Sequence, residues 1–203
     1  GFISVATCGL VLAAGALAAY PLARVSFRGS QVVLFLIIAP MMIPGLVSLV
    51  PTYIVMAKLG LLDSYQGLIL IYWVHSLPLA VWILRGFFQT IPGELEDAAA
   101  VDGASRLQIL WSIVLPLSQP ALAAVALLVF LNSWNEFVIA SIMTSSAVMR
   151  TAQVFLYLNM TDVGVNWGEM MAAALAINLP VLGMFLLLQR RFIAGLTAGG
   201  LKF

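Results

Sequence analysis

The chain has 203 residues, of which 63% are hydrophobic and 8% charged, with a formal net charge of +1 and a mean hydropathy of +1.10. A soluble domain of this length carries about 45–50% apolar and about 25% charged residues, so the composition excludes a water-soluble globular protein. The only cysteine, Cys8, lies in an apolar stretch, which excludes a disulfide framework and favours a small hydrophobic role inside a helix. We therefore interpret residues 1–203 as a single membrane domain.

Five stretches are apolar and long enough to cross a bilayer as helices, which takes about 20 residues each. In chain order they are residues 2–23, 32–57, 67–84, 120–140 and 168–188. The second contains several prolines and should break near Pro44, leaving residues 46–57 as a separate helix. Small residues in the first stretch would let neighbouring helices approach closely, and they are Gly9, Ala13, Ala14, Gly15, Ala18 and Ala19. The sequence thus predicts an all-α, polytopic transmembrane helix bundle.

Basic residues gather on one side of the predicted membrane. If the spans alternate in direction, two basic residues, Lys58 and Arg150, fall on one side and seven on the other. The seven are Arg24, Arg28, Arg85, Arg106, Arg190, Arg191 and Lys202. Because cytoplasmic loops are enriched in Lys and Arg, we expect the loop of residues 85–119 and the C-terminus to be cytoplasmic. Gly1 then lies outside, and we expect one further helix upstream, giving six spans in the parent chain.

The longest polar segment, residues 85–119, carries the pattern of two capped helices. Pro92 and the three acids after it are typical of a first helical turn, where proline is tolerated and acids complement the helix dipole. Gly103 lies where a helix would stop. Ser105 and Gln108 then form a capping-box pattern for a second helix.

We expect that second helix to run to Leu115 and to stop at Pro116, so that residues 90–116 form a helix–turn–helix at the membrane face. The first helix is rich in alanines and acids, which suits docking into a groove on a basic partner. The alternative is an ordinary solvated loop with good caps, and the residues by themselves leave both interpretations open.

The same segment resembles the E-A-A-x3-G-x9-I-x-L-P motif of binding-protein-dependent ABC importer permeases. The matching residues are Asp97, Ala98, Ala99, Gly103, Ile113, Leu115 and Pro116. Asp97 stands where that family usually has Glu, and its neighbour Glu96 points about 100° away on a helix. The stretches "LRGFFQTIPGELEDAA", "SWNEF", "NWGEMMAAA" and "LQRRFIAGLTAGGLKF" also resemble the carbohydrate-uptake branch of that family, close to the maltose-type second permease subunit.

The resemblance implies the type I ABC importer permease fold, with the 90–116 loop as a coupling helix seated in a cleft of a separate nucleotide-binding subunit. It implies as partners a second homologous permease, two ATPase subunits, an extracytoplasmic solute-binding protein and membrane lipid, with no nucleic acid. ATP and Mg would be bound by the ATPase and no cofactor by this chain, which is then not an enzyme. Neither Lys58 nor Lys202 lies in a phosphate-binding G-x-x-x-x-G-K-[ST] motif. The family's C-terminal tail also reaches the ATPase, which makes Thr197, Gly199 and Gly200 candidate contacts.

Polar side chains inside predicted spans are costly and therefore indicate function. Asn132, Trp134, Asn135 and Glu136 combine the amide, carboxylate and aromatic groups that bind sugars, so they are candidates for a substrate path. The alternative is hydrogen bonding between helices and anchoring by Trp134. For His75 we favour a packing role over proton relay, because the sequence offers no second histidine or nearby acid.

The loop of residues 141–167 is predicted to lie outside, where the family meets its binding protein. Arg150, Asn159, Asp162 and Asn166 are the candidate contacts there.

The sequence therefore predicts the permease subunit of an ATP-driven importer for a sugar or oligosaccharide, in a bacterial or archaeal cytoplasmic membrane. An importer of glycerol phosphate or a polyol is the nearest alternative. An ion-coupled secondary transporter would need charge pairs inside the membrane, and an intramembrane enzyme would need a nucleophile with a base. Neither a secondary transporter nor an intramembrane enzyme would need the docking pattern of the polar loop.

Overall fold

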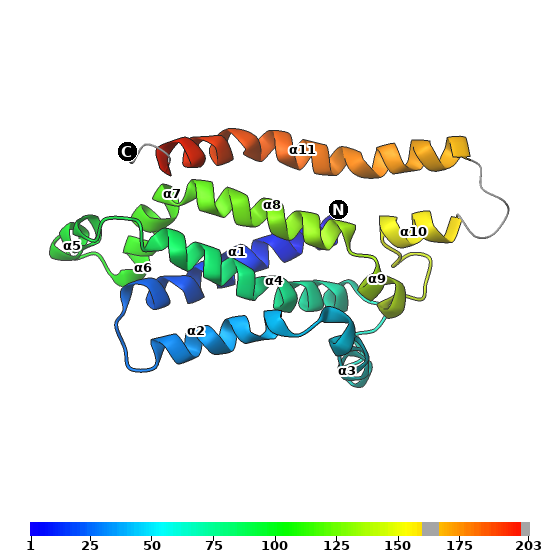
Figure 1. The fold of residues 1–203 in the computed structure, drawn as a ribbon, viewed down its shortest axis with the longest axis horizontal. Helices are drawn as coiled ribbons and strands as arrows, with labels where there is room; N and C mark the ends of the chain where they lie inside the picture. The colour runs from blue at the N-terminus through cyan, green and yellow to red at the C-terminus, as the bar shows by residue number, and fades with distance from the viewer. Residues whose placement is uncertain (160–166, 200–203) are drawn as a thin grey trace.

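The computed structural model describes residues 1–159 and 167–199, which form helices and no strand (Figure 1). In chain order the elements are α1 (Phe2–Arg24), α2 (Ser30–Ile38), the 3-10 turn η1 (Ala39–Met42), α3 (Gly45–Lys58), α4 (Tyr65–Phe88), α5 (Glu94–Val101), α6 (Arg106–Ile109), the π-helical turn η2 (Leu110–Val114), α7 (Leu115–Leu117), α8 (Gln119–Asn135), α9 (Val138–Met143), α10 (Ala152–Asn159) and α11 (Trp167–Gly199). The predicted all-α class is confirmed.

Within the described residues, three helices are long and apolar enough to cross a membrane: α1, α4 and the Trp167–Leu187 part of α11. Two further pairs of helical segments, each joined at a sharp bend, are long and apolar enough only when the two segments are taken together. Residues 30–42 meet α3 at 99°, and residues 106–117 meet α8 at 80°. The number rises to five if each bent pair is one span. Five spans therefore stay a prediction.

The two ends of the bundle carry different elements (Figure 1). One end holds α5, α6 and α7 together with the C-terminal end of α11, and we call it the α5 end. The opposite end holds α3, α9 and α10, and we call it the α3 end.

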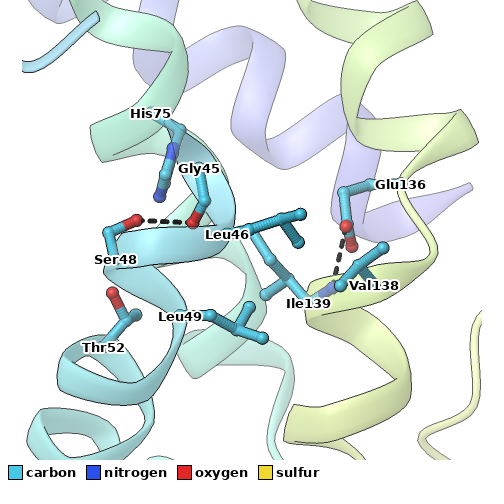
Figure 2. A pocket seen from close by; sticks show the side chains of 9 residues that line it. All are labelled: Gly45, Leu46, Ser48, Leu49, Thr52, His75, Glu136, Val138 and Ile139. Atoms are coloured by element: carbon cyan, nitrogen blue, oxygen red, sulfur yellow. Dashed lines mark hydrogen bonds between the residues drawn. The ribbon is translucent and has the colours of Figure 1, made fainter. Parts of the chain in front are cut away.

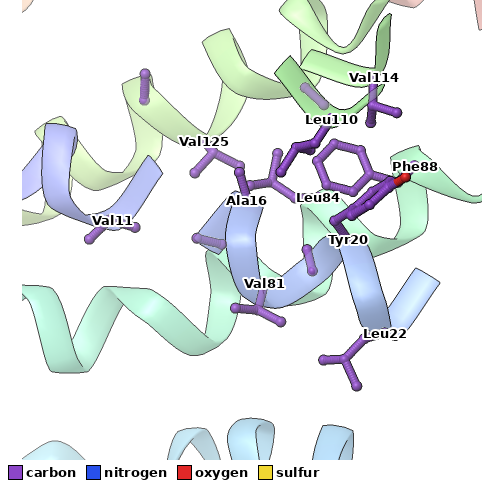
Figure 3. Close-up of a cluster of buried hydrophobic side chains, with 14 of the residues drawn as sticks. Val11, Ala16, Tyr20, Leu22, Val81, Leu84, Phe88, Leu110, Val114 and Val125 are labelled. Atoms are coloured by element: carbon purple, nitrogen blue, oxygen red, sulfur yellow. The ribbon is translucent and has the colours of Figure 1, made fainter. Parts of the chain in front are cut away.

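The main core joins α1, α4, η2 and α8 (Figure 3). Its fully buried side chains include Val11 of α1, Leu84 and Phe88 of α4, Val114 of η2 and Val125 of α8. The polar loop between α4 and α8 is thus part of the core and does not hang free from it.

Small residues set the distance between α1 and α4. A Cβ atom at Gly15 would lie 3.3 Å from the Cβ atom of Ala80, tighter than most real contacts. Ala19 is fully buried, whereas Gly9 and Ala13 are exposed. The predicted close approach is confirmed at Gly15 and Ala19. Ala14 and Ala18 are half-buried, and the exposed Gly9 and Ala13 take no part.

The break predicted in the second apolar stretch is confirmed. α2 and η1 end at Met42, and α3 starts directly after Pro44, which fixes an extended backbone conformation (φ −57°, ψ 127°). Pro51 lies inside α3 and removes one N–H from its interior.

The predicted fourth span, residues 120–140, is wrong at its end. α8 stops at Asn135, and α9 begins three residues later. Glu136 accepts hydrogen bonds from the backbone N–H groups of Ile139 (2.8 Å) and Ala140 (2.9 Å). The carboxylate satisfies amide donors that a new helix leaves unpaired, so it favours the break.

The prediction that the second loop helix stops at Pro116 is also wrong. Pro116 lies within α7, and the chain turns at Ser118 before α8 begins. Proline lacks an N–H and crowds the preceding turn, and the wider π-helical turn η2 directly before it accommodates both effects.

α11 lies along α8 (Figure 1) and also contacts α10. Part of its described surface is apolar and open. Leu175, Leu179 and Leu187 are 70%, 64% and 77% exposed. Asn178 donates from Nδ2 to the Ala174 carbonyl oxygen (2.8 Å), so this amide is satisfied within its own helix.

Candidate functional site

The loop of residues 90–116 begins with a short helix, α5, that is capped at its C-terminal end. The N–H groups of Glu96 and Asp97 both donate to the Gly93 carbonyl oxygen at 2.9 Å. At the other end, Ala104 donates to Ala99 (2.9 Å) while Gly103 adopts the left-handed conformation with φ +86°. Together with the Gly103 to Ala100 bond (3.1 Å), this is a Schellman motif, so the predicted stop at Gly103 is confirmed.

A capping box starts the next helix, as predicted. The Ser105 N–H donates to Gln108 Oε1 (2.7 Å), and the Gln108 N–H donates to Ser105 Oγ (3.4 Å). Two helices joined by a tight glycine turn therefore follow from local signals alone.

Glu96 attaches α5 to the bundle. Its side chain is buried, with Oε1 2.6 Å from Arg24 Nε and Oε2 accepting from the Tyr20 hydroxyl at 2.9 Å. Arg24 also donates from Nη2 to the Ile91 carbonyl oxygen (2.8 Å). The last turn of α1 thus holds both the start of the loop and the inner face of α5.

The sequence-based interpretation missed this anchor. It treated Glu96 as a neighbour pointing away from the motif residue Asp97, which is correct but incomplete. Tyr20 and Arg24 lie four residues apart and therefore on the same face of α1. A hydroxyl and a guanidinium placed together in this way could have indicated a carboxylate partner. Nothing local to α5 identified its partner, because 72 residues separate Arg24 from Glu96.

The opposite face of α5 is open. Asp97 and Ala98 are exposed, and Val101 is 88% exposed at the tip of the helix. Ala99 is half-buried and packs against the main core. Small, acidic and apolar groups therefore share an exposed surface on a helix whose opposite face is bonded to α1 through Glu96.

The later motif residues attach the loop to the bundle. Ile113 and Leu115 are half-buried against the main core, while Pro116 is exposed. Their neighbours Ile109 and Leu110 are each 1% exposed. Asp97, Ala98 and Pro116 are thus exposed, whereas Ala99, Ile113 and Leu115 face the main core.

The predicted tail contacts lie at the end of α11. Thr197 and Gly199 belong to its last turns, and Gly200 lies outside the described residues. α11 ends at the α5 end of the bundle (Figure 1).

The four predicted substrate-path residues do not form one cluster. Trp134 donates from Nε1 to the Ile177 carbonyl oxygen (3.1 Å) and stacks on Phe130 at 5.5 Å, so it ties α8 to α11. Asn132 is exposed, and Asn135 accepts from Gln153 Nε2 at 3.5 Å. These contacts support the alternative in which the polar groups hold helices together.

Glu136 lines a cavity (Figure 2). It also accepts from the Tyr72 hydroxyl at 2.8 Å. His75 lines the same cavity and is not buried in the core of this chain, so the packing role expected for it stays a prediction.

Of the candidate outer contacts, Arg150 is exposed in the segment before α10, and Asn159 is the last residue of α10. Asp162 and Asn166 lie outside the described residues. The sequence missed Asp63, whose carboxylate accepts from the N–H groups of Ser145 (2.9 Å) and Ser146 (3.1 Å). These backbone donors hold the pKa of the Asp63 carboxyl below its ordinary value.

The fold and these sites define a polytopic helical membrane protein with an exposed helix fixed to one end of its bundle. The family model described as "Binding-protein-dependent transport system inner membrane component" matches residues 11–196. The chain belongs to this family of ABC importer permeases.

Curated relatives and a solved structure agree. The chain is 39% identical over 187 residues to the trehalose/maltose transport system permease protein MalG of Thermococcus litoralis, a match covering 92% of this chain and 67% of the relative. It is 37% identical over 200 residues to the sulfoquinovosyl glycerol transport system permease protein SmoH of Agrobacterium fabrum, covering 98% and 70%. A crystal structure of a bacterial ABC transporter involved in import of the acidic polysaccharide alginate contains a similar chain, with TM-score 0.80, 29% identity and coverage of 94% and 72%.

Proposed function

We propose that this chain is a membrane subunit of an ATP-driven, binding-protein-dependent importer of a sugar or oligosaccharide. A separate ATPase would drive alternating access through α5. The observation that carries this proposal is the two-sided construction of α5. Its inner face is fixed by the Glu96–Arg24 ion pair, while Asp97 and Ala98 are open to a partner.

A helix fixed in this way transmits a push from outside to the bundle. Force on its outer face would reach α1 through Glu96 and Arg24, and would reach α4 and α8 through the buried side chains of η2. ATP binding and a loaded binding protein would then bias one equilibrium between two bundle arrangements.

The assembly that follows contains a second homologous permease, two ATPase subunits and a solute-binding protein. The open apolar surface of α11 supports burial against lipid or the second permease. Arg24 and Arg85, in the last turns of α1 and α4, support a cytoplasmic α5 end and a cytoplasmic C-terminus. Arg150 and Asn159, toward the α3 end, are proposed to face the binding protein, and Thr197 and Gly199 the ATPase.

The test is ATP-driven sugar uptake by the assembled transporter carrying Ala98→Trp. The matched control is Ala100→Trp, because Ala100 is an exposed alanine on the same helix about 200° around its axis. We expect Ala98→Trp to abolish uptake while the purified bundle stays folded, and Ala100→Trp to retain more uptake. Normal uptake with Ala98→Trp, or equal loss with both variants, would contradict docking through the outer face of α5.

A further inference from the structure

A cavity of about 280 Å³ lies where α3, α4 and α9 meet (Figure 2). A neighbouring space of about 370 Å³ shares part of its lining and extends toward η1. The cavity is close to the lower end of the range typical of small-molecule sites, roughly 300–1,000 Å³.

Three polar side chains face this space from two helices. Ser48 and Thr52 lie four residues apart on one side of α3, and His75 comes from α4 (Figure 2). Ser48 donates from Oγ to the Gly45 carbonyl oxygen (2.8 Å), which leaves its oxygen free to accept. Thr52 and His75 form no side-chain hydrogen bond to the described residues, so their polar atoms are available to a ligand.

These groups suit a ligand with many hydroxyls. A serine or threonine hydroxyl can both donate and accept a hydrogen bond, and a neutral imidazole donates at one nitrogen and accepts at the other. These groups match sugar hydroxyls, which also donate and accept. Leu46, Leu49 and Ile139 provide an apolar wall for the C–H surface of a ring. Such a site holds a sugar weakly, because its described lining has no aromatic face to stack on, and weak binding suits a substrate that must leave again.

The charge of the side chains that line the cavity limits the charge that a ligand can carry. Glu136 contributes a carboxylate, and no Lys or Arg occurs among the described residues that line the cavity. A carboxylate, sulfonate or phosphate on the ligand would therefore meet a like charge with no cation to offset it.

We propose that this cavity is a transit site for a neutral sugar and that it rejects anionic sugars. The inference rests on the proposed function as an importer permease and adds a ligand class to it. It separates this chain from the solved neighbour, which is involved in import of an acidic polysaccharide, and from the relative named for sulfoquinovosyl glycerol, which carries a sulfonate. It aligns this chain with the relative named for trehalose and maltose.

The experiment places a cysteine in the cavity, Thr52→Cys with Cys8→Ala, in the complete transporter with its partner permease, ATPase and binding protein. Maleimide labelling is followed with maltose, trehalose or glucuronate at equal concentration. We expect the neutral disaccharides to slow labelling at least about threefold and glucuronate to have little effect. Ser141→Cys is the control, because Ser141 is an exposed residue of α9 outside the cavity, and its labelling should not respond to either sugar.

A second pair of variants measures uptake. Ser48→Ala combined with Thr52→Val should lower maltose or trehalose uptake by about tenfold, since two hydrogen bonds are lost. The matched control is Ser141→Ala, whose hydroxyl donates to a carbonyl three residues back at 2.8 Å as Ser48 does.

The outcomes separate this inference from the proposed function. Equal protection by glucuronate, or no protection together with unchanged uptake in the double variant, overturns the neutral-sugar site while uptake sensitive to Ala98→Trp preserves the proposed function. A complex without ATP-driven sugar uptake overturns both.

Discussion

Two glutamates, one at each end of the bundle, are held in different ways. Glu96 at the α5 end is 3% exposed and has a guanidinium and a tyrosine as partners. Glu136 toward the α3 end is half-buried, with a tyrosine and two backbone amides as partners and a cavity in front of it.

The difference shows how the two ends are built. Charge that is buried and neutralised by Arg24 fixes an element firmly to the bundle, which suits transmission of force. A carboxylate that accepts from backbone N–H groups positions a short helix beside an open cavity, which suits contact with a ligand. The following variants test whether the two ends differ in this way.

The largest effect is expected from Glu96→Ala. Removing one partner leaves Arg24 charged in a site where its side chain is 15% exposed, and breaking such a pair costs about 3–5 kcal/mol of unfolding free energy. Denaturant unfolding of the purified protein in detergent measures the loss. Glu94→Ala, at an exposed position of the same helix, should change stability by less than about 0.5 kcal/mol. Similar values for the two variants would remove the anchor from the account.

Tyr72→Phe tests the other glutamate. It removes a donor to a charged acceptor, so we expect a loss of about 1.5–3 kcal/mol, less than for Glu96→Ala. The same unfolding measurement applies, with Tyr53→Phe on the surface of α3 as the control. A loss equal to that of Glu96→Ala would mean that both ends are fixed equally firmly, and the comparison would fail.

Gly103→Ala isolates the turn after α5. A Cβ there meets no atom within 4 Å, so the cost comes from the left-handed backbone alone, about 1–2 kcal/mol. Gly93 precedes the same helix with φ −63° and equally open surroundings, so Gly93→Ala should be neutral or slightly stabilising. Equal effects of the two substitutions would show that the turn geometry is not required.

The smallest effect concerns Asp63 and pH. Its carboxyl has a pKa lowered by the Ser145 and Ser146 amides, so the charged form is favoured in the folded protein. Its contribution is therefore present at neutral pH and is lost as pH falls through the lowered pKa, below about pH 4. The protection factor of the Ser145 and Ser146 amides, which compares their exchange rate with that of an unstructured peptide at the same pH, should fall on acidification. Asp63→Asn should show a low protection factor already at neutral pH. Protection of these two amides in Asp63→Asn that is as high as in the unchanged protein at every pH would contradict this.

The sequence predicted features whose information lies within a few residues. Gly103, the Ser105–Gln108 pair and the break at Pro44 are confirmed because each is a local conformational requirement. Pro116 misled the prediction, since a wider turn before it accommodates the proline without ending the helix.

Contacts between distant residues could not be predicted. The ion pair of Glu96 with Arg24 and the bond from Tyr72 to Glu136 join positions 72 and 64 residues apart. The cavity depends on the 99° bend between residues 30–42 and α3, and composition gives no angle. Thr52 and His75 therefore became candidates only when the helices were placed.

The most direct test of the central claim is a cysteine cross-link from Ala98 to the ATPase subunit. Ala98→Cys is made in a Cys8→Ala background, since Cys8 is buried in α1, and Ala13→Cys, exposed in the middle of α1, is the control. We predict a specific cross-link from position 98 whose yield changes with ATP, and none from position 13. No cross-link from position 98 in a complex shown to be intact would contradict the account, because the open face of α5 would not be the contact with the motor.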